Sequence, residues 1–282
     1  MDKSSLRLRP RSQNWLLVPA LLLMTVCFLV PLGEVAQWSL RPDLYLDFLA
    51  ADNPYRTIMV DTFLLSFGVA VLTVALAYPV AYYLTQVTGL RQTVLLIAIL
   101  TPLWVSVLIR TYGWIVVLGR SGLVNSLLLA TNLTDEPVQL LYSRFAVYVA
   151  MIQVLMPIAV LMLYSTMASI NEGFVRAARS LGASPFKAFR HVFFPMTAGA
   201  VVSSGILVFV LSLGFFITPA LVGGPDDVLI SNVIQMQVNE TMDWELAATL
   251  SVILLASGAA LVGALVMVLR KALRADLTGG VK

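Results

Sequence analysis

The sequence predicts an all-α polytopic membrane protein with six transmembrane helices. Of its 282 residues, 59% are hydrophobic and only 12% are charged, and the mean hydropathy is +0.90. A soluble domain of this length could not bury so much apolar surface, so lipid must solvate much of the chain. Six apolar stretches are long enough to cross a bilayer, which requires about 20 helical residues. We expect the helices at 15–38, 62–84, 93–118, 145–167, 201–222 and 247–269.

The basic residues indicate how these helices are oriented. Most of the lysines and arginines lie in the arm 1–14, the loop 170–195 and the tail 270–282. The opposite side carries only Arg41, Arg56, Arg120 and Arg144. Because cytoplasmic loops are enriched in Lys and Arg, we expect both termini to be cytoplasmic. A single transmembrane domain, 15–269, lies between them in the sequence. The charge-free stretch 15–32 is longer than the core of a usual signal peptide, so we expect the first helix to be retained.

The residue types exclude several other functions. Cys27 is the only cysteine, which excludes an intrachain disulfide, and His191 is the only histidine, which excludes a multi-histidine metal site. No GxxxxGK[ST] motif is present, so the chain cannot hydrolyse ATP by the usual P-loop route. We expect no catalytic residue, no metal and no cofactor bound by this chain. The net positive charge of +3 arises from the basic residues expected on the cytoplasmic side of the membrane, and it does not indicate nucleic acid binding.

The loop 170–195 has the pattern of two helices joined by a rigid elbow. Gly182 stops the first helix, where a left-handed cap is favourable for glycine. Ser184 and Pro185 then begin a second helix, with a hydroxyl N-cap followed by proline at the first helical position. The first helix is amphipathic. Its apolar positions are Ile170, Phe174, Ala177, Ala178 and Leu181, and its polar positions are Asn171, Glu172, Arg176, Arg179 and Ser180.

The same stretch resembles the EAA loop of bacterial ATP-binding-cassette (ABC) importer permeases. The pattern of that loop is Glu-Ala-Ala, three residues, Gly, nine residues, an aliphatic residue, any residue, Leu and Pro. The chain departs from it at Arg176, where the family usually has Glu, and at Phe194, where it has Leu. The residues that fall on the pattern in register are Ala177, Ala178, Gly182, Val192 and Pro195.

Three further segments resemble the spermidine/putrescine-type subfamily of these permeases: TPLWVSVLIRTYGW, LGFFITPALVGGP and DWELAATLSVIL. The resemblance implies a type I ABC importer permease fold in the bacterial inner membrane. It also implies three kinds of protein partner besides lipid: a second, homologous permease, two copies of a cytoplasmic ATPase that binds ATP and Mg, and a periplasmic solute-binding protein. The implied cargo is a small amine such as spermidine or putrescine.

Other cargoes and another mechanism stay open. Relatives in this subfamily also move opines, γ-aminobutyrate, aminophosphonates or ferric iron, and the binding protein largely decides the cargo. An autonomous secondary transporter is a further alternative, which buried carboxylates in mid-span would favour. We see none well inside a span.

We expect the loop to dock on the ATPase and to couple ATP hydrolysis to transport. Polar contacts would come from Glu172, Arg176 and Arg179, and apolar anchors from Phe174 and Leu181. The residues predicted for this site are Glu172, Phe174, Arg176, Ala177, Ala178, Arg179, Leu181, Gly182 and Pro195.

Four residues are candidates for the translocation pathway or its gate. Arg110 lies in the third apolar stretch, where a charge is costly unless it reaches the interface, pairs or faces water. Asp61, at the start of the second stretch, is a possible partner for it. Phe215 and Phe216 lie in the outer part of the fifth stretch and could contribute to a gate. Prolines such as Pro102 could act as hinges or as packing features.

Overall fold

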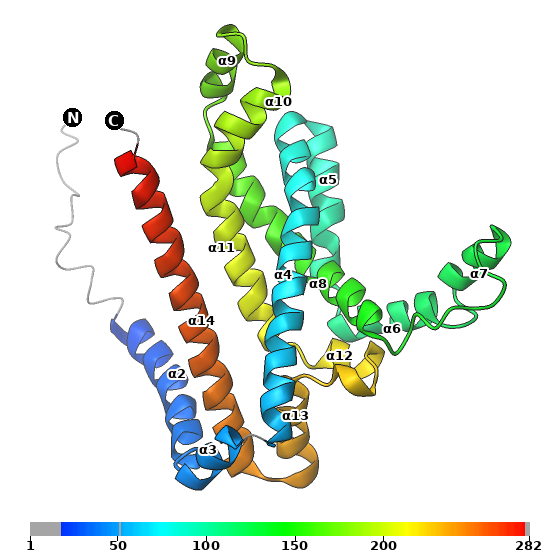
Figure 1. Ribbon diagram of the computed structural model, residues 1–282, viewed down its shortest axis with the longest axis vertical. Coiled ribbons are helices and arrows are strands. Elements are labelled where there is room, and N and C mark those ends of the chain that lie inside the picture. The colour runs from blue at the N-terminus through cyan, green and yellow to red at the C-terminus, as the bar shows by residue number, and fades with distance from the viewer. Residues whose placement is uncertain (1–17, 51, 280–282) are drawn as a thin grey trace, which may run out of the picture.

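The computed structural model describes residues 18–50 and 52–279, and all regular elements in these ranges are helical (Figure 1). The predicted arm 1–14 and the end of the predicted tail, 280–282, lie outside the described residues. The α-helices in these ranges are α2 (Val18–Trp38), α3 (Pro42–Leu49), α4 (Pro54–Gln86), α5 (Leu90–Leu100), α6 (Val107–Leu118), α7 (Leu123–Ala130), α8 (Arg144–Ser169), α9 (Glu172–Ser180), α10 (Pro185–Ala188), α11 (Phe194–Leu213), α12 (Ile217–Val222), α13 (Ile230–Met236) and α14 (Trp244–Gly279).

Six helical stretches in the described part of the chain are long and apolar enough to span a membrane. They are Val18–Trp38, Pro54–Gln86, Val107–Ala130, Arg144–Ser169, Pro185–Leu213 and Trp244–Val268. A shorter apolar stretch, Leu90–Trp104, accompanies them.

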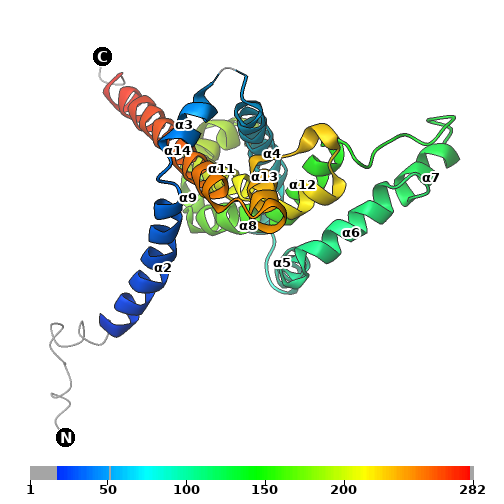
Figure 2. The ribbon, with the colours of Figure 1, turned by 90° about the horizontal axis from the view of Figure 1, so that it is seen from below.

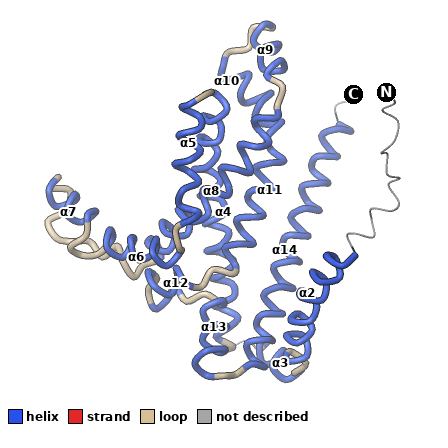
Figure 3. The backbone as a smooth tube through the Cα atoms, turned by 180° about the vertical axis from the view of Figure 1, so that it is seen from behind, coloured by secondary structure: helices blue, strands red, loops and turns tan. Residues whose placement is uncertain are grey.

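The core of the bundle is formed by α4, α8 and α11, which pack side by side (Figures 1 and 3). On α4 the buried positions recur every three or four residues, so one face of the helix points at α8 and α11. Several of them are small, which lets helices approach closely where lipid supplies no hydrophobic driving force between them. These small buried residues are Ser66, Ala70, Thr73, Ala77 and Ala81 on α4, and Ala146, Ala150 and Ala159 on α8.

α2 and α14 lie at the side of this core and contact each other (Figure 2). None of the residues of α2 is buried, and large apolar side chains such as Leu22, Met24 and Phe28 are exposed. An exposed helix with so many apolar side chains is stable in lipid but not in water. The carboxyl-terminal end of α14 lies at the same end of the bundle as α9, and α3 and α13 lie at the opposite end (Figure 1).

The third span is not the single helix predicted at 93–118. α5 ends at Leu100, a 3-10 turn follows at Thr101–Trp104, and α6 begins at Val107. Pro102 lacks an N–H and cannot continue the helical hydrogen bonds, and Val105 and Ser106 have extended ψ angles of 132° and 139°. α5 therefore runs beside α4, whereas α6 and α7 project sideways from the bundle (Figures 1 and 3).

The fifth span also differs from the single helix predicted at 201–222. The helical stretch begins at Pro185, passes through a π-helical turn at Phe189–Phe193 and ends at Leu213. Gly214 then ends it, and α12 is a separate helix. The prediction failed because the residues around the break are apolar, so hydropathy alone continues across it.

Candidate functional site

The elbow between α9 and α10 is closed by the local caps that the sequence predicts. Gly182 has φ +89°, the left-handed conformation that glycine adopts without strain. Its N–H donates to the carbonyl of Arg179 at 3.0 Å, and the N–H of Ala183 donates to that of Ala178 at 3.1 Å. These two bonds form a Schellman motif. The predicted end of the first helix at Gly182 is thus confirmed.

The two helices on either side of the elbow also begin with side-chain caps. Asn171 Oδ1 accepts a hydrogen bond of 2.8 Å from the N–H of Gly173, which caps α9. Ser184 Oγ accepts one of 3.3 Å from the N–H of Lys187, and Pro185 occupies the first position of α10. The predicted restart of the helix at Ser184–Pro185 is confirmed. Pro195, the last predicted residue, lies in the first turn of α11.

An aromatic cluster fixes the second half of the elbow to α4. The ring of Tyr82 lies 5.3 Å from that of Phe189 and 5.1 Å from that of Phe193, in edge-to-face geometry. One turn earlier on α4, Tyr78 Oη and Thr197 Oγ1 share a hydrogen bond of 2.9 Å. The segment that joins α10 to α11 is therefore packed directly against α4.

The tip of the elbow is apolar and exposed. Leu181 is 89% exposed, Phe186 68% and Phe174 56%. In water, three exposed apolar side chains on one short helix–turn–helix are typical of an interaction surface. We call Phe174, Leu181 and Phe186 the elbow tip. Arg176, Ala177 and Arg179 are also exposed on α9, whereas Ala178 is half-buried, and the side chain of Glu172 lies outside the described residues.

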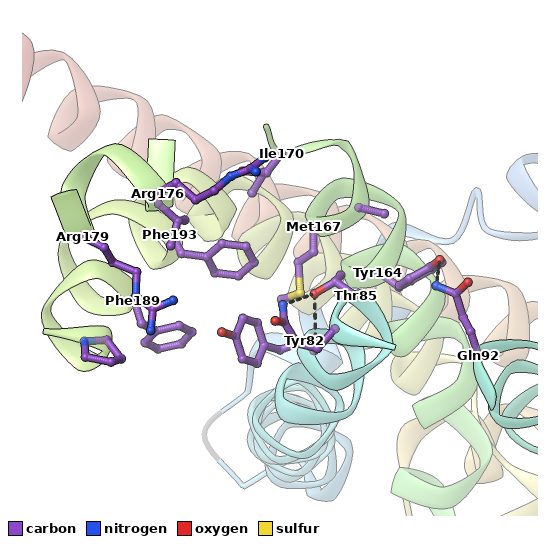
Figure 4. Close-up of a pocket in the computed structure, with 14 residues that line it drawn as sticks. Tyr82, Thr85, Gln92, Tyr164, Met167, Ile170, Arg176, Arg179, Phe189 and Phe193 are labelled. Carbon is purple, nitrogen blue, oxygen red and sulfur yellow. Dashed lines mark hydrogen bonds between the residues drawn. The ribbon is translucent and has the colours of Figure 1, made fainter. Parts of the chain in front are cut away.

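Beneath the elbow lies a cavity of about 510 Å3 between α9 and the ends of α4 and α8 (Figure 4). Arg176 and Arg179 line it from α9, and Tyr82 and Tyr164 line it from the bundle. Gln92 Nε2 donates to Tyr164 Oη at 2.9 Å and to the carbonyl of Leu84 at 3.0 Å, which joins the start of α5 to α4 and α8. The two arginines predicted as docking residues thus share one solvent-accessible cavity.

Asp61, which the sequence offers as a possible partner for Arg110, pairs instead with Arg144. Asp61 Oδ1 lies 3.5 Å from Arg144 Nη2, and Arg144 Nε lies 3.6 Å from Asp227 Oδ1. Arg144, at the first turn of α8, therefore bridges α4 and the turn that precedes α13. Sequence reasoning missed this role because a charge at the end of an apolar stretch indicates topology and does not reveal its partner. The Nε and Nη1 atoms of Arg110 are buried and have no hydrogen-bond partner among the described residues.

Other acidic residues at the same end of the bundle are also paired. Arg41 forms ion pairs with Asp43 and with Glu245, and so connects the start of α3 to the start of α14. The hydrogen bond from the Arg41 guanidinium lowers the pKa of the Asp43 carboxyl below its usual value. Asp227 is 8% exposed and accepts a hydrogen bond of 3.0 Å from the N–H of Gly224. These carboxylates hold segments together and do not form a free acidic surface.

Phe215 and Phe216 lie in the break between α11 and α12. Phe215 packs against the core, and Phe216 is 39% exposed. A gate role for the two rings stays a prediction. α12 in turn contacts α6, where Thr111 Oγ1 and Thr218 Oγ1 share a buried hydrogen bond of 3.3 Å.

Comparison with known proteins identifies related sequences. Residues 6–278 match the family described as binding-protein-dependent transport system inner membrane component. The spermidine/putrescine transport system permease protein PotB of Escherichia coli K12 is 32% identical over 179 residues, which cover 64% of this chain and 65% of that protein. PotB of Haemophilus influenzae is 28% identical over 244 residues, 85% of each chain. With the PotB of Salmonella typhimurium and that of E. coli, the chain aligns over less than two thirds of their length.

Solved structures show the same fold. A chain in the crystal structure of a bacterial alginate ABC transporter, in complex with an alginate pentasaccharide-bound periplasmic protein, superimposes with a TM-score of 0.72. The superposition covers 89% of this chain and 92% of that one, at 17% sequence identity. A second structure of a bacterial ABC transporter that imports alginate gives a TM-score of 0.68. The helical arrangement is therefore that of an ABC transporter permease.

Proposed function

Because the chain belongs to the family of binding-protein-dependent transport system inner membrane components, we propose that it is a permease subunit of an ATP-driven importer. The observation that carries the proposal is the exposed elbow tip on a segment that continues into the core helix α11. Such a segment can receive a force from a soluble partner and deliver it to the membrane domain. With no P-loop in this sequence, ATP and Mg would be bound by the partner ATPase.

In this mechanism the elbow docks on a cytoplasmic ATPase. Phe174 and Leu181 anchor the contact, and Arg176 and Arg179 add polar contacts at its margin. Closure of the ATPase dimer moves α9 and the elbow, and the aromatic cluster around Tyr82 passes this motion to α4 and α11. The translocation pathway then switches from access on the cytoplasmic side to access on the opposite side of the membrane.

The proposed assembly has four kinds of component. The chain pairs with a second, homologous permease, and the two bind two ATPase subunits and one periplasmic solute-binding protein. The elbow and the carboxyl-terminal end of α14 lie at one end of the bundle (Figure 1), which supports placing both of them on the same, cytoplasmic side of the membrane. The distribution of Lys and Arg in the sequence supports the same orientation.

The cargo we propose is a small amine such as spermidine or putrescine. The support is the similarity to PotB proteins over as much as 85% of the chain. A weaker similarity, 25% over 217 residues, links the chain to a putative ferric transport system permease protein of H. influenzae, FbpB 1, of which it covers 34%. An iron importer is therefore the comparison to include in any cargo assay.

Reconstitution tests the proposal. The chain would be assembled in vesicles with its permease partner, ATPase and binding protein, and uptake of radiolabelled putrescine would be measured with and without ATP. We expect uptake only with ATP and binding protein, and no uptake with an ATPase whose catalytic glutamate is replaced. Putrescine uptake by vesicles that contain this chain alone, with no nucleotide, would contradict it.

A further inference from the structure

The cavity beneath the elbow has a positively charged lining. Arg176 and Arg179 line it from α9, and no Asp or Glu is among the described residues that do so. Its volume of about 510 Å3 lies in the range of small-ligand sites, about 300–1,000 Å3. Basic pockets between transmembrane helices on the cytoplasmic side of a membrane are typical sites for the phosphate groups of lipids.

Arg179 has donors available for such a ligand. Its side chain is exposed, and it forms no ion pair with a carboxylate of the described residues. Figure 4 shows it reaching from α9 toward the rings of Phe189 and Tyr82, which line the same cavity. A guanidinium binds a phosphate through two parallel N–H···O bonds, which are stronger than hydrogen bonds between neutral groups.

Tyr82 offers a further donor from α4. Its backbone carbonyl accepts a hydrogen bond of 2.7 Å from Thr85 Oγ1, but its Oη atom bonds to none of the residues that the structure describes. The ring itself is held in place by its edge-to-face contacts with Phe189 and Phe193. A phosphate in the cavity could therefore accept hydrogen bonds from α9 and from α4 at once.

Arg179 lies on the side of α9 that faces the bundle. At about 100° per residue, it is about 140° around the helix from Phe174, which belongs to the elbow tip. Val175, four residues before Arg179 and therefore on the same side of α9, packs against the core. The elbow tip and the cavity thus occupy different faces of α9, so a partner that docks on the tip leaves the cavity side of the helix in place.

The cavity lies at the depth of lipid headgroups. Its residues from α4 and α8 belong to the last two turns of these helices, which end at Gln86 and Ser169. With 33 and 26 residues, the two helices are about 50 and 39 Å long, whereas the hydrocarbon core of a bilayer is about 30 Å thick. Their last turns therefore extend into the region where the phosphates of lipids lie.

We propose that this cavity binds a phosphate group, with Arg179 as its main ligand and Arg176 and Tyr82 as further donors. Two sources supply such a group at this depth, the headgroup of an anionic lipid and free phosphate in the cytoplasm. The inference rests on the proposed cytoplasmic placement of the elbow and is independent of the cargo. The aromatic cluster holds the second half of the elbow on α4, and the bound phosphate holds the first half there, so it regulates how freely α9 moves.

The test measures binding to the full-length chain in nanodiscs. In one arm the nanodiscs are an equal mixture of phosphatidylcholine and phosphatidylglycerol, and native mass spectrometry counts the phosphatidylglycerol that the protein retains. In the other arm inorganic phosphate is titrated into nanodiscs of phosphatidylcholine alone, and calorimetry measures its binding. Hydrogen exchange of the α9 amides, with and without the ligand, reports whether the phosphate restrains the elbow, and it should slow when the ligand binds.

The variants separate the cavity from the charge of the elbow in general. We expect Arg179→Gln to weaken binding about 10-fold, because it removes the bidentate ligand. Tyr82→Phe keeps the ring contacts and removes only the hydroxyl, and should weaken binding about 3-fold. Arg190→Gln is the matched control, because Arg190 is exposed on the same elbow but is not among the described residues that line the cavity, and it should bind as the unaltered chain does.

The outcomes decide both the site and its source of phosphate. Binding that falls in Arg179→Gln but not in Arg190→Gln supports the site, and the arm in which it occurs identifies lipid or free phosphate. No binding by the unaltered chain in either arm, or an equal loss in Arg179→Gln and Arg190→Gln, would overturn it. If Arg179→Gln does not fold, Tyr82→Phe decides, and unchanged binding would then exclude the cavity. Because the assay contains no cargo, failed amine import by the complete assembly would leave the site standing.

Discussion

The side-chain hydroxyl of Ser231 donates a hydrogen bond of 2.6 Å to the backbone carbonyl of Phe215. The next residue repeats the arrangement, since Asn232 Nδ2 donates to the carbonyl of Phe216 at 2.7 Å. These carbonyls belong to the break after α11. The residue four positions after Phe215 is Pro219, which has no N–H to donate, whereas the carbonyl of Phe216 also accepts a hydrogen bond of 3.1 Å from the N–H of Ala220. The start of α13 therefore stabilises the break, and with it the separate direction of α12.

Replacing Ser231 tests this relationship. We expect Ser231→Ala to lower the free energy of unfolding by about 1 kcal/mol, the usual net value of one hydrogen bond. Reversible unfolding in mixed micelles would measure the change. Ser165→Ala is the control, because the hydroxyl of Ser165 is exposed and bonds only within α8, to the carbonyl of Met162. Equal effects of the two substitutions would contradict the role of Ser231.

Substitutions at Gly182 should uncouple ATP hydrolysis from uptake. A Cβ at this position would meet no atom within 4 Å, so only the positive φ opposes a side chain. A non-glycine residue in this conformation costs roughly 1–2 kcal/mol, less for Asn and more for a β-branched residue. We expect the amount of amine imported per ATP hydrolysed to fall in the order Gly, Asn, Ala, Val, with a loss of several-fold for Gly182→Val.

The matched control for Gly182 is Gly199→Ala, which also meets no atom within 4 Å but lies in α11 at an ordinary helical φ. This variant should import as much amine per ATP hydrolysed as the unaltered assembly does. If Gly182→Val also keeps that ratio, the elbow conformation does not determine coupling.

Leu181 should be needed for ATPase binding but not for stability. Since it is 89% exposed, Leu181→Ser removes little packing in the isolated permease, and the midpoint of unfolding should stay the same. An apolar anchor at an interface contributes about 1–2 kcal/mol, so affinity for the ATPase should fall about 10-fold. Titration of the ATPase against permease in nanodiscs measures this, and Leu133→Ser, at a residue 72% exposed beyond α7, is the control. An unaltered affinity in Leu181→Ser would exclude the elbow tip as the docking surface.

Arg144 should be important for stability. Arg144→Met leaves the carboxylate of Asp227, which is 8% exposed, without its cation, and we expect a loss of about 1–3 kcal/mol in the free energy of unfolding. Adding Asp227→Asn, which removes the uncompensated charge, should recover part of that loss. Arg120→Met changes an exposed arginine that forms no ion pair within the described residues, and should have no effect. If Arg120→Met lowers the free energy of unfolding as much as Arg144→Met does, the effect comes from losing one positive charge and not from losing the ion pairs of Arg144.

The sequence predicts local features of this fold well and tertiary ones poorly. The elbow could be derived because glycine, serine and proline each act on their own backbone within a few residues. The breaks at Pro102 and Gly214 could not be placed from hydropathy, because the flanking residues are apolar on both sides. The partner of Asp61 could not be identified either, since Arg110 and Arg144 both lie near it by topology, and only packing of α4 on α8 selects Arg144.

The continuity of the helical stretch from Pro185 to Leu213 has a mechanical consequence. Its 29 residues form a lever arm of about 43 Å, at about 1.5 Å per residue. If the contact of Phe193 with Tyr82 acts as the fulcrum, the far end at Leu213 lies about 30 Å from it, and a tilt of about 5° displaces that end by roughly 3 Å. A rotation of this size at the elbow would thus move the break that carries Phe215 and Phe216 by about 3 Å.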